Sequence, residues 1–359
     1  MKCPECQHEH PGHWEQMTCQ VCDYQFCFDP HEHPPMTDDR WLGLLERASR
    51  NGAFRFTFEQ LVTAYQYAEN RQRQDGFLSQ IWLSPFLGLG AGYLLKELFE
   101  APFYPTSFVC ALLLVAWGSI SKSPSRETEA QTVRDWLEKW KDSRGNPALL
   151  LTEPALSSPP PEWSESLIYN DGIEKLLVVN RDLLVDLLVS NGVHTSNRML
   201  IISESGYPFK QLDHVQRYLD QSTEFPIYLL HDADRQLDSE SHIESIREKL
   251  TALKLSVQAH PIIDLGIHSH QLPTLTPLNK LGMQEADDCI PLDALPIHAL
   301  TEALPSCLAD QISLAEFYAR SNLKNADGYT EQKEQSGCGC GPSSCGPNTC
   351  VSVCDVPSR

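Results

Sequence analysis

Four cysteines near the N-terminus form two Cys-x-x-Cys pairs. Cys3 and Cys6 make the first pair, and Cys19 and Cys22 follow after a gap of twelve residues. Each pair offers two thiolates from one tight turn, and two such pairs at this spacing are typical of a tetrahedral zinc site. A segment this small cannot bury a core of its own, so metal binding would supply most of its folding free energy. The sequence therefore predicts one structural Zn²⁺ bound by these four cysteines.

Other metal-binding side chains surround the two pairs and leave alternatives open. They are Cys27 and the histidines His8, His10, His13, His31 and His33. A four-thiolate set does not need them, so we expect these histidines to be solvated or to lie around the site. The stretch from Cys3 to Phe28 resembles half of an in-between-RING module of some ubiquitin ligases, and it also resembles many unrelated zinc ribbons. Pro30 stands where that module has its next cysteine, and the ligase activity is not carried over.

A second group of candidate residues lies at the ends of predicted strands. The predicted strand over 226–234 ends in Asp232-Ala233-Asp234. Alternate residues of an extended segment point the same way, so both carboxylates could hold one Mg²⁺. Glu204 and Asp182 follow two other predicted strands and could assist them. The alternative is that the Asp-x-Asp segment caps the helix that follows.

This layout resembles the Toprim domain, particularly that of the topoisomerase VI A-subunit. Gly206-Tyr207-Pro208 and Asp232-Ala233-Asp234 match the turn and the acidic strand end of that family in order and spacing. The resemblance implies an α/β fold with a Mg²⁺ site that cleaves nucleic-acid strands. However, Asn180 occupies the position of the family's first acidic residue. The Thr-Arg pair after the turn and the upstream domain with the cleaving tyrosine are also missing, so the resemblance implies the fold and not the activity.

Strand and helix patterns alternate through the second half of the chain. The predicted strands span 175–180, 199–203, 226–234 and 255–263. The predicted helices between them span 181–192, 209–221 and 240–254. This alternation predicts a Rossmann-like α/β domain with a mostly parallel sheet, whose ligands would bind beyond the carboxyl ends of the strands. His268 and His270 follow the last strand as a His-x-His pair that can chelate a metal, although solvated or core histidines are more frequent.

Two apolar stretches lie in the middle of the chain. Residues 77–95 and 101–121 carry no charge and are separated only by Lys-Glu-Leu-Phe-Glu. Each is close to the length that spans a hydrocarbon core. The flanks carry more Lys and Arg than the connection, so the positive-inside rule places both termini in the cytoplasm. The stretches predict a transmembrane helical hairpin in an integral membrane protein; the alternative is a buried hairpin of a soluble protein.

These observations give a multidomain organisation. The expected parts are a zinc ribbon (1–34), a small helical element (35–76), the transmembrane hairpin (77–121), a juxtamembrane helix with a Pro-rich linker (122–170), the α/β Toprim-like domain with a helical extension (171–335) and a Cys-rich disordered tail (336–359). The helix expected over 126–141 has Val133, Trp136, Leu137 and Trp140 on one face. That face would lie at the membrane interface or pack on the following domain. The tail could bind a soft metal, act in redox chemistry or have no defined role.

Composition narrows the function. The 359 residues carry 48 Asp and Glu against 28 Lys and Arg, a net charge of −20, so the chain lacks the basic footprint of a nucleic-acid-binding protein. We expect a membrane-anchored, cytoplasm-facing scaffold or regulator with a non-catalytic α/β domain that binds a protein partner or a nucleotide-like ligand. The alternative is a Mg²⁺-dependent phosphoryl-transfer or nuclease enzyme that uses Asp232 and Asp234. The sequence does not indicate an oligomeric state.

Overall fold

The structure is a computed structural model of the chain. It describes residues 2–10, 17–29, 31–32, 35–71, 125–154, 172–221, 223–234, 239–268, 271 and 289–320. All of them belong to one compact unit. The predicted hairpin over 77–121, the Pro-rich segment after residue 154, His270 and the Cys-rich tail lie outside the described residues.

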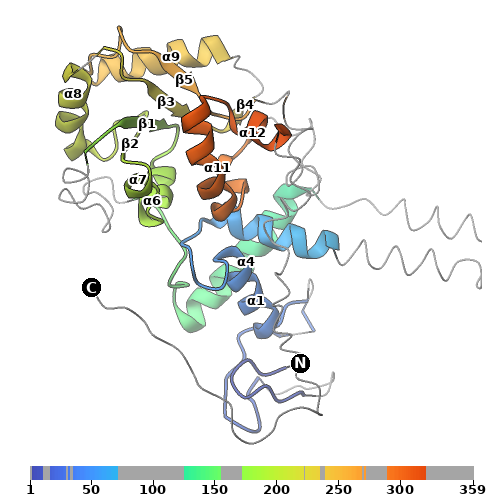
Figure 1. Cartoon of the computed structure of the whole chain (residues 1–359). Helices are drawn as coiled ribbons and strands as arrows, with labels where there is room; N and C mark the ends of the chain where they lie inside the picture. Colours follow the sequence, from blue (N-terminus) through green and yellow to red (C-terminus); the bar gives the residue numbers. More distant parts are fainter. Residues whose placement is uncertain are drawn as a thin grey trace, which may run out of the picture. The chain divides into compact units, whose positions relative to one another are not determined.

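A four-stranded parallel sheet forms the centre of the second half of the chain (Figure 1). Its strands are β1 (Lys175–Val179), β2 (Met199–Ser203), β3 (Ile227–Leu230) and β5 (Ile262–Asp264), in the order β2-β1-β3-β5. Apart from the half-buried Lys175 that begins β1, the inner strands consist of buried Leu, Val, Ile and Tyr, as expected for a parallel sheet covered on both faces. The α/β fold predicted from the alternating pattern is therefore confirmed.

Helices connect consecutive strands of the sheet. After β1 the chain forms α6 (Asp182–Ser190) and α7 (Val193–Ser196); after β2 it forms α8 (Leu212–Gln221), and after β3 it forms α9 (Ser239–Ala252). The chain runs from β1 to β2 in one direction and from β2 to β3 in the other. Right-handed crossovers then place the first and later helices on opposite faces, as Figure 1 shows. The reversal of direction occurs between β1 and β3, which is where ligands bind in open α/β sheets.

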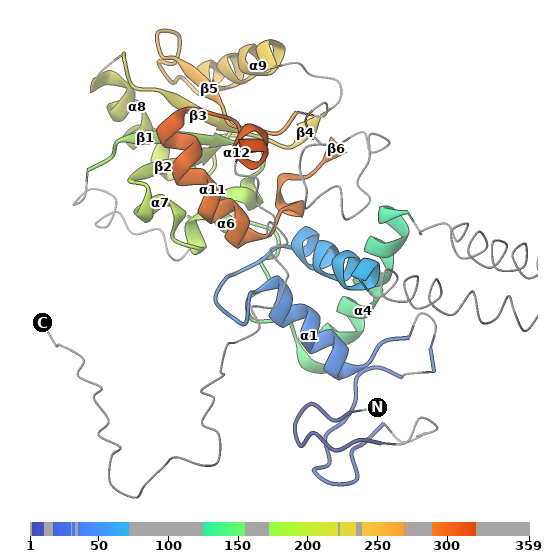
Figure 2. The same cartoon turned by 45° about the vertical axis from the view of Figure 1, so that its right-hand side comes forward.

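The chain then returns across the sheet (Figure 2). The short strand β6 (Cys289–Ile290) pairs antiparallel with β4 (Ala233–Asp234). Helices α11 (Ile297–Asp310) and α12 (Leu314–Arg320) follow, and their apolar side chains belong to the same core as the sheet. The helical extension expected after the sheet is present, although β5 is shorter than the predicted strand over 255–263.

A second core is built from segments far apart in the sequence. Helix α1 (Asp38–Ala48) begins at Thr37, whose hydroxyl accepts a hydrogen bond from the Arg40 N–H. A second helix over 58–71 begins at Thr57, which exchanges hydrogen bonds with Gln60 in a capping box. Helix α4 (Arg126–Arg144) packs on both.

The aromatic face of α4 is covered by the protein. The Trp140 ring lies 6.2 Å from that of Phe28 and 6.3 Å from that of Trp41, and the Trp136 ring lies 5.3 Å from that of Tyr65. This face therefore packs on the N-terminal helical element. The sequence suggested instead that it lies at the membrane interface or packs on the following domain. Between α1 and the helix over 58–71, Phe56 makes an isolated bridge to Leu150, which follows α4 in the chain.

The membrane prediction requires a correction. No helix in the described ranges is long and apolar enough to span a bilayer. Helix α4 has 19 residues, but ten of them are Asp, Glu, Lys or Arg, and each such charge is costly in hydrocarbon. We therefore withdraw the transmembrane hairpin from the fold class, and with it the integral membrane location and the lipid bilayer as a partner. The fold that the structure supports is an α/β domain joined to a cysteine-pair module and a helical element.

Candidate functional site

The two cysteine pairs adopt the same local backbone. In the first, the Cys3 N–H donates to the His8 carbonyl and the Gln7 N–H donates to the Cys3 carbonyl, both at 2.9 Å. In the second, Cys19 and Asp23 repeat these bonds at 2.7 and 3.0 Å. Gln7 and Asp23 close the two turns. Both have a left-handed backbone conformation, with φ of 61° and 58°. The repeated geometry aims two thiols from each turn at one point.

The four sulfur atoms have the spacing that a zinc ion needs. All four Sγ atoms lie within 4.8 Å of one another, and the Cys3–Cys22 and Cys6–Cys19 distances are both 3.6 Å. A tetrahedron with Zn–S bonds of about 2.3 Å has sulfurs about 3.8 Å apart. Cys3 and Cys19 are fully buried. These four cysteines could therefore hold a metal ion such as zinc, in agreement with the sequence prediction.

Among the four thiols, Cys19 has a lowered pKa, whereas the pKa values of Cys6 and Cys22 are raised. Burial opposes ionisation of Cys19, but the backbone N–H groups of Val21 and Cys22 outweigh it and lower the pKa of Cys19 to about 6. The His10 Nε2 lies 3.3 Å from the Cys19 sulfur, so His10 is a neighbour of the cluster and not one of its four members. A thiolate is the form that binds zinc.

Asp38 ties the cysteine module to the helical element. Its buried carboxylate accepts hydrogen bonds from the Tyr24 hydroxyl at 2.9 Å and from the backbone N–H groups of Cys27 and Phe28 at 3.0 Å. The guanidinium of Arg144 lies 4.4 Å from the centre of the Tyr24 ring. The cysteine module therefore contacts α1 through Asp38 and α4 through Arg144. Cys27 takes part in this contact through its backbone N–H.

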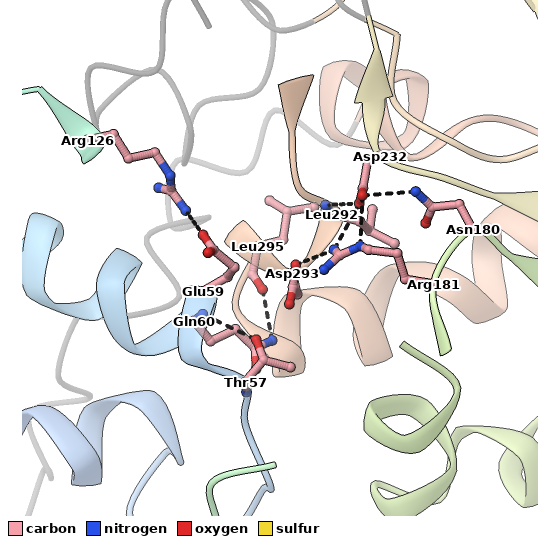
Figure 3. Close-up of polar contacts among 10 residues, drawn as sticks. All are labelled: Thr57, Glu59, Gln60, Arg126, Asn180, Arg181, Asp232, Leu292, Asp293 and Leu295. Carbon is pink, nitrogen blue, oxygen red and sulfur yellow. Dashed lines mark hydrogen bonds and ion pairs between the residues drawn. The ribbon is translucent and has the colours of Figure 1, made fainter. Parts of the chain in front are cut away.

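The predicted strand-end carboxylate Asp232 is held by protein groups (Figure 3). Its oxygens accept from the Asn180 amide at 2.9 Å, from Arg181 at 3.0 Å and from the Leu292 N–H at 2.5 Å. Arg181 also donates to the fully buried Asp293 at 2.5 Å. Burial opposes the charge of Arg181, but Asp293 and Asp232 more than offset it and raise its pKa. The position between β1 and β3 is therefore filled by an Arg–Asp network.

The other predicted carboxylates have partners of their own. Asp182 accepts from the Ser205 hydroxyl at 2.7 Å, and Glu204 pairs with Lys249 at 3.0 Å. In the described ranges, neither residue joins Asp232 in a group that could hold a metal ion. The side chain of Asp234 lies outside the described part of the structure.

A cavity of about 660 Å³ opens beyond β1 and β2. Its charged lining consists of two cations and two anions: Arg181, Lys249, Asp182 and Glu204. Because these charges balance and are paired within the protein, the cavity has no excess positive charge to attract a phosphate group.

A third cluster was not predicted as a set. His231 Nε2 lies 3.0 Å from one oxygen of Asp264, and His268 Nε2 lies 3.2 Å from the other. Burial opposes ionisation of Asp264, but hydrogen bonds with His231 and His268 keep its pKa far below the usual range. His242 stacks on His231 with ring centres 4.1 Å apart. Burial and the proximity of His231 lower the pKa of His242 to about 4, so its ring is neutral at pH 7.

The sequence held a partial signal for this cluster. His231 directly follows β3 and Asp264 ends the neighbouring strand β5, so both lie at the carboxyl edge of the sheet. Sequence reasoning paired His268 with His270, and it considered only the Asp residues after β3. The set comes together because β3 and β5 are adjacent in the sheet, which the sequence pattern alone does not give.

No known protein family, curated protein or solved structure matches this chain. The resemblances to in-between-RING modules and to the Toprim domain therefore gain no support from these comparisons. The chemistry of the sites rests on the geometry described above.

Proposed function

We propose that this chain is a non-enzymatic scaffold whose zinc-bound cysteine module docks a protein partner. One observation carries the proposal. Val21 lies at the tip of the second Cys-x-x-Cys turn, and its side chain is 61% exposed. A turn closed by a metal ion holds such a side chain in one place, so little conformational entropy is lost when a partner binds it.

The surroundings of Val21 indicate the chemistry of the partner. Exposed residues of the two turns include the acidic Glu5, Glu9 and Asp23, against the single basic Lys2. Charge complementarity then favours a protein surface with an apolar patch and a basic rim. The acidic excess of the whole chain acts in the same direction and would speed the encounter.

The α/β domain supports a scaffold role better than the enzyme alternative. Asp232, which a Mg²⁺-dependent enzyme would need as a ligand, already accepts from Asn180, Arg181 and Leu292. A Mg²⁺ ion there would have to displace a paired guanidinium. In this proposal the domain is a rigid base for the docking module.

The test is affinity purification with quantitative mass spectrometry. Val21→Asp places a charge in the contact and should reduce the captured amount of a specific partner at least about tenfold, since one unpaired buried charge costs more than about 1.4 kcal/mol. Cys3→Ser with Cys19→Ser should remove the same partner. Phe209→Asp is the matched control, because Phe209 is also a large apolar residue and is 51% exposed. Capture that is equal for Val21→Asp and Phe209→Asp would refute the proposal.

A further inference from the structure

We propose that His231, Asp264 and His268 bind a second metal ion, a divalent transition metal for which Zn²⁺ is the first candidate. The site lies at the carboxyl ends of β3 and β5 and is separate from the four cysteines. It adds a metal centre to the α/β domain and does not depend on the scaffold proposal.

The distances match those of metal ligands. The ligand atoms of the three residues lie within 4.8 Å of one another, and the two nitrogen–oxygen distances are 3.0 and 3.2 Å. Ligands bound tetrahedrally at about 2.0 Å lie about 3.3 Å apart. Two imidazoles and one carboxylate are a set that suits zinc and other late first-row metals.

The hydrogen bonds of His231 orient its ring for metal binding. Its Nδ1 lies 2.6 Å from the backbone carbonyl of Asp232, and a carbonyl can only accept, so Nδ1 carries the proton. Nε2 then either carries a second proton, as in an ion pair with Asp264, or presents a lone pair toward that carboxylate. A lone pair and a carboxylate repel each other unless a cation such as a metal ion lies between them. A backbone carbonyl that holds one ring nitrogen is also the usual support of a metal-binding histidine.

His242 provides an independent sign of a ligand. Its side chain is 9% exposed, and neither ring nitrogen has a hydrogen-bond partner among the described residues. Leaving such a polar group unpaired costs about 1–3 kcal/mol. The ring lies against His231 on the α9 side of the cluster, with ring centres 4.1 Å apart. His242 is not one of the three grouped ligands, but its unpaired ring nitrogens beside them indicate a ligand that the described residues do not supply.

Gly266 leaves room for the cluster. A Cβ atom at this position would lie 2.3 Å from Nε2 and Cδ2 of His231, so only glycine fits beside the ring. The Gly266 N–H donates to Asp264 at 2.8 Å and fixes that carboxylate. The backbone therefore supports both ligands from the β5 side.

The competing explanation is a metal-free ion pair between protonated His231 and Asp264. Zinc analysis of the purified full-length chain separates the two. The proposal predicts two zinc ions per chain in the wild type and one in the Asp264→Asn/His268→Gln chain. His260→Gln is the matched control: this buried histidine bonds the Phe225 carbonyl and takes no part in the cluster, so zinc content should not change.

X-ray absorption at the zinc edge keeps the test valid if a cluster variant fails to fold. The chain is measured with Cys3→Ser and Cys19→Ser, which leaves the histidines intact. The remaining zinc should show nitrogen and oxygen ligands at about 2.0–2.1 Å. A remaining zinc with sulfur ligands near 2.3 Å would belong to the other cysteines of the chain and would overturn the proposal. A content of one zinc per wild-type chain that does not change in Asp264→Asn/His268→Gln would also overturn the proposal.

Discussion

Arg181→Met should be one of the most destabilising single substitutions in the α/β domain. The guanidinium pairs with two carboxylates, Asp232 and Asp293, and its Nη2 donates to both (Figure 3). Methionine keeps most of the length and the apolar stem of the side chain. The substitution therefore removes the charge and the hydrogen bonds with little loss of volume.

The cost follows from what each carboxylate retains. Asp232 still accepts from Asn180 and from the Leu292 N–H. Asp293 is fully buried, and its second oxygen has no hydrogen-bond partner among the described residues, so it becomes an unpaired buried charge. Removing one partner of a buried ion pair costs about 3–5 kcal/mol. For a domain of this size, about 3 kcal/mol lowers the melting temperature by roughly 6–12 °C.

The assay is thermal and urea denaturation of the full chain, followed by far-ultraviolet circular dichroism. Arg198→Met is the matched control, because its pair with Glu174 has both side chains more than half exposed, at 55% and 53%. Such a surface pair contributes little to stability, because water and salt screen it. Adding Asp293→Asn to Arg181→Met should recover part of the loss, since the unpaired charge is gone. If Arg181→Met costs no more than Arg198→Met, the network does not hold the strand ends together.

Three further substitutions test separate contacts. Gln60→Leu removes the capping box and the 3.0 Å hydrogen bond from the buried Gln60 amide to the Leu295 carbonyl. Urea denaturation should show that the free energy of unfolding falls by about 1–3 kcal/mol. An unchanged denaturation midpoint would contradict this contact. Gly266→Ala should destabilise by about 1–3 kcal/mol because its methyl group collides with His231, whereas Gly43→Ala, with nothing within 4 Å in helix α1, should be neutral or stabilising. For His298, burial and the nearby Arg50 lower the pKa to about 4 in the folded chain. Its ordinary pKa is about 6.5, so protonation favours the unfolded chain. This contribution to stability is complete above about pH 6.5 and is lost as the pH falls toward 4, by about 3 kcal/mol in total. The pH dependence of unfolding should be flatter over this range in His298→Gln, and equal slopes would contradict the assignment.

The strands and the cysteine pairs were predictable because their signals are local. Runs such as Leu176–Val179 and Met199–Ile202 are apolar throughout, and such runs bounded by polar residues form buried parallel strands. Cys-x-x-Cys is equally local, because both thiols come from one turn.

The sites between elements were not predictable, since they depend on which strands and helices become neighbours. The contact between Arg181 and Asp293 joins residues 112 positions apart. The role of α4 has the same origin: two tryptophans on a charged helix suit a membrane interface as well as a protein core. Only the packing against Phe28, Trp41 and Tyr65 decides between them.

The central claim is that the zinc-bound turn presents Val21 to a protein partner. The most direct measurement is photocrosslinking in cells, with a photoreactive amino acid at position 21 of the full chain and, as a control, at the exposed Glu127 of α4. The account predicts a discrete crosslinked protein from position 21 alone, and its loss when Cys3→Ser and Cys19→Ser are added. Crosslinks that are the same from both positions, or that persist without the two cysteines, would contradict it.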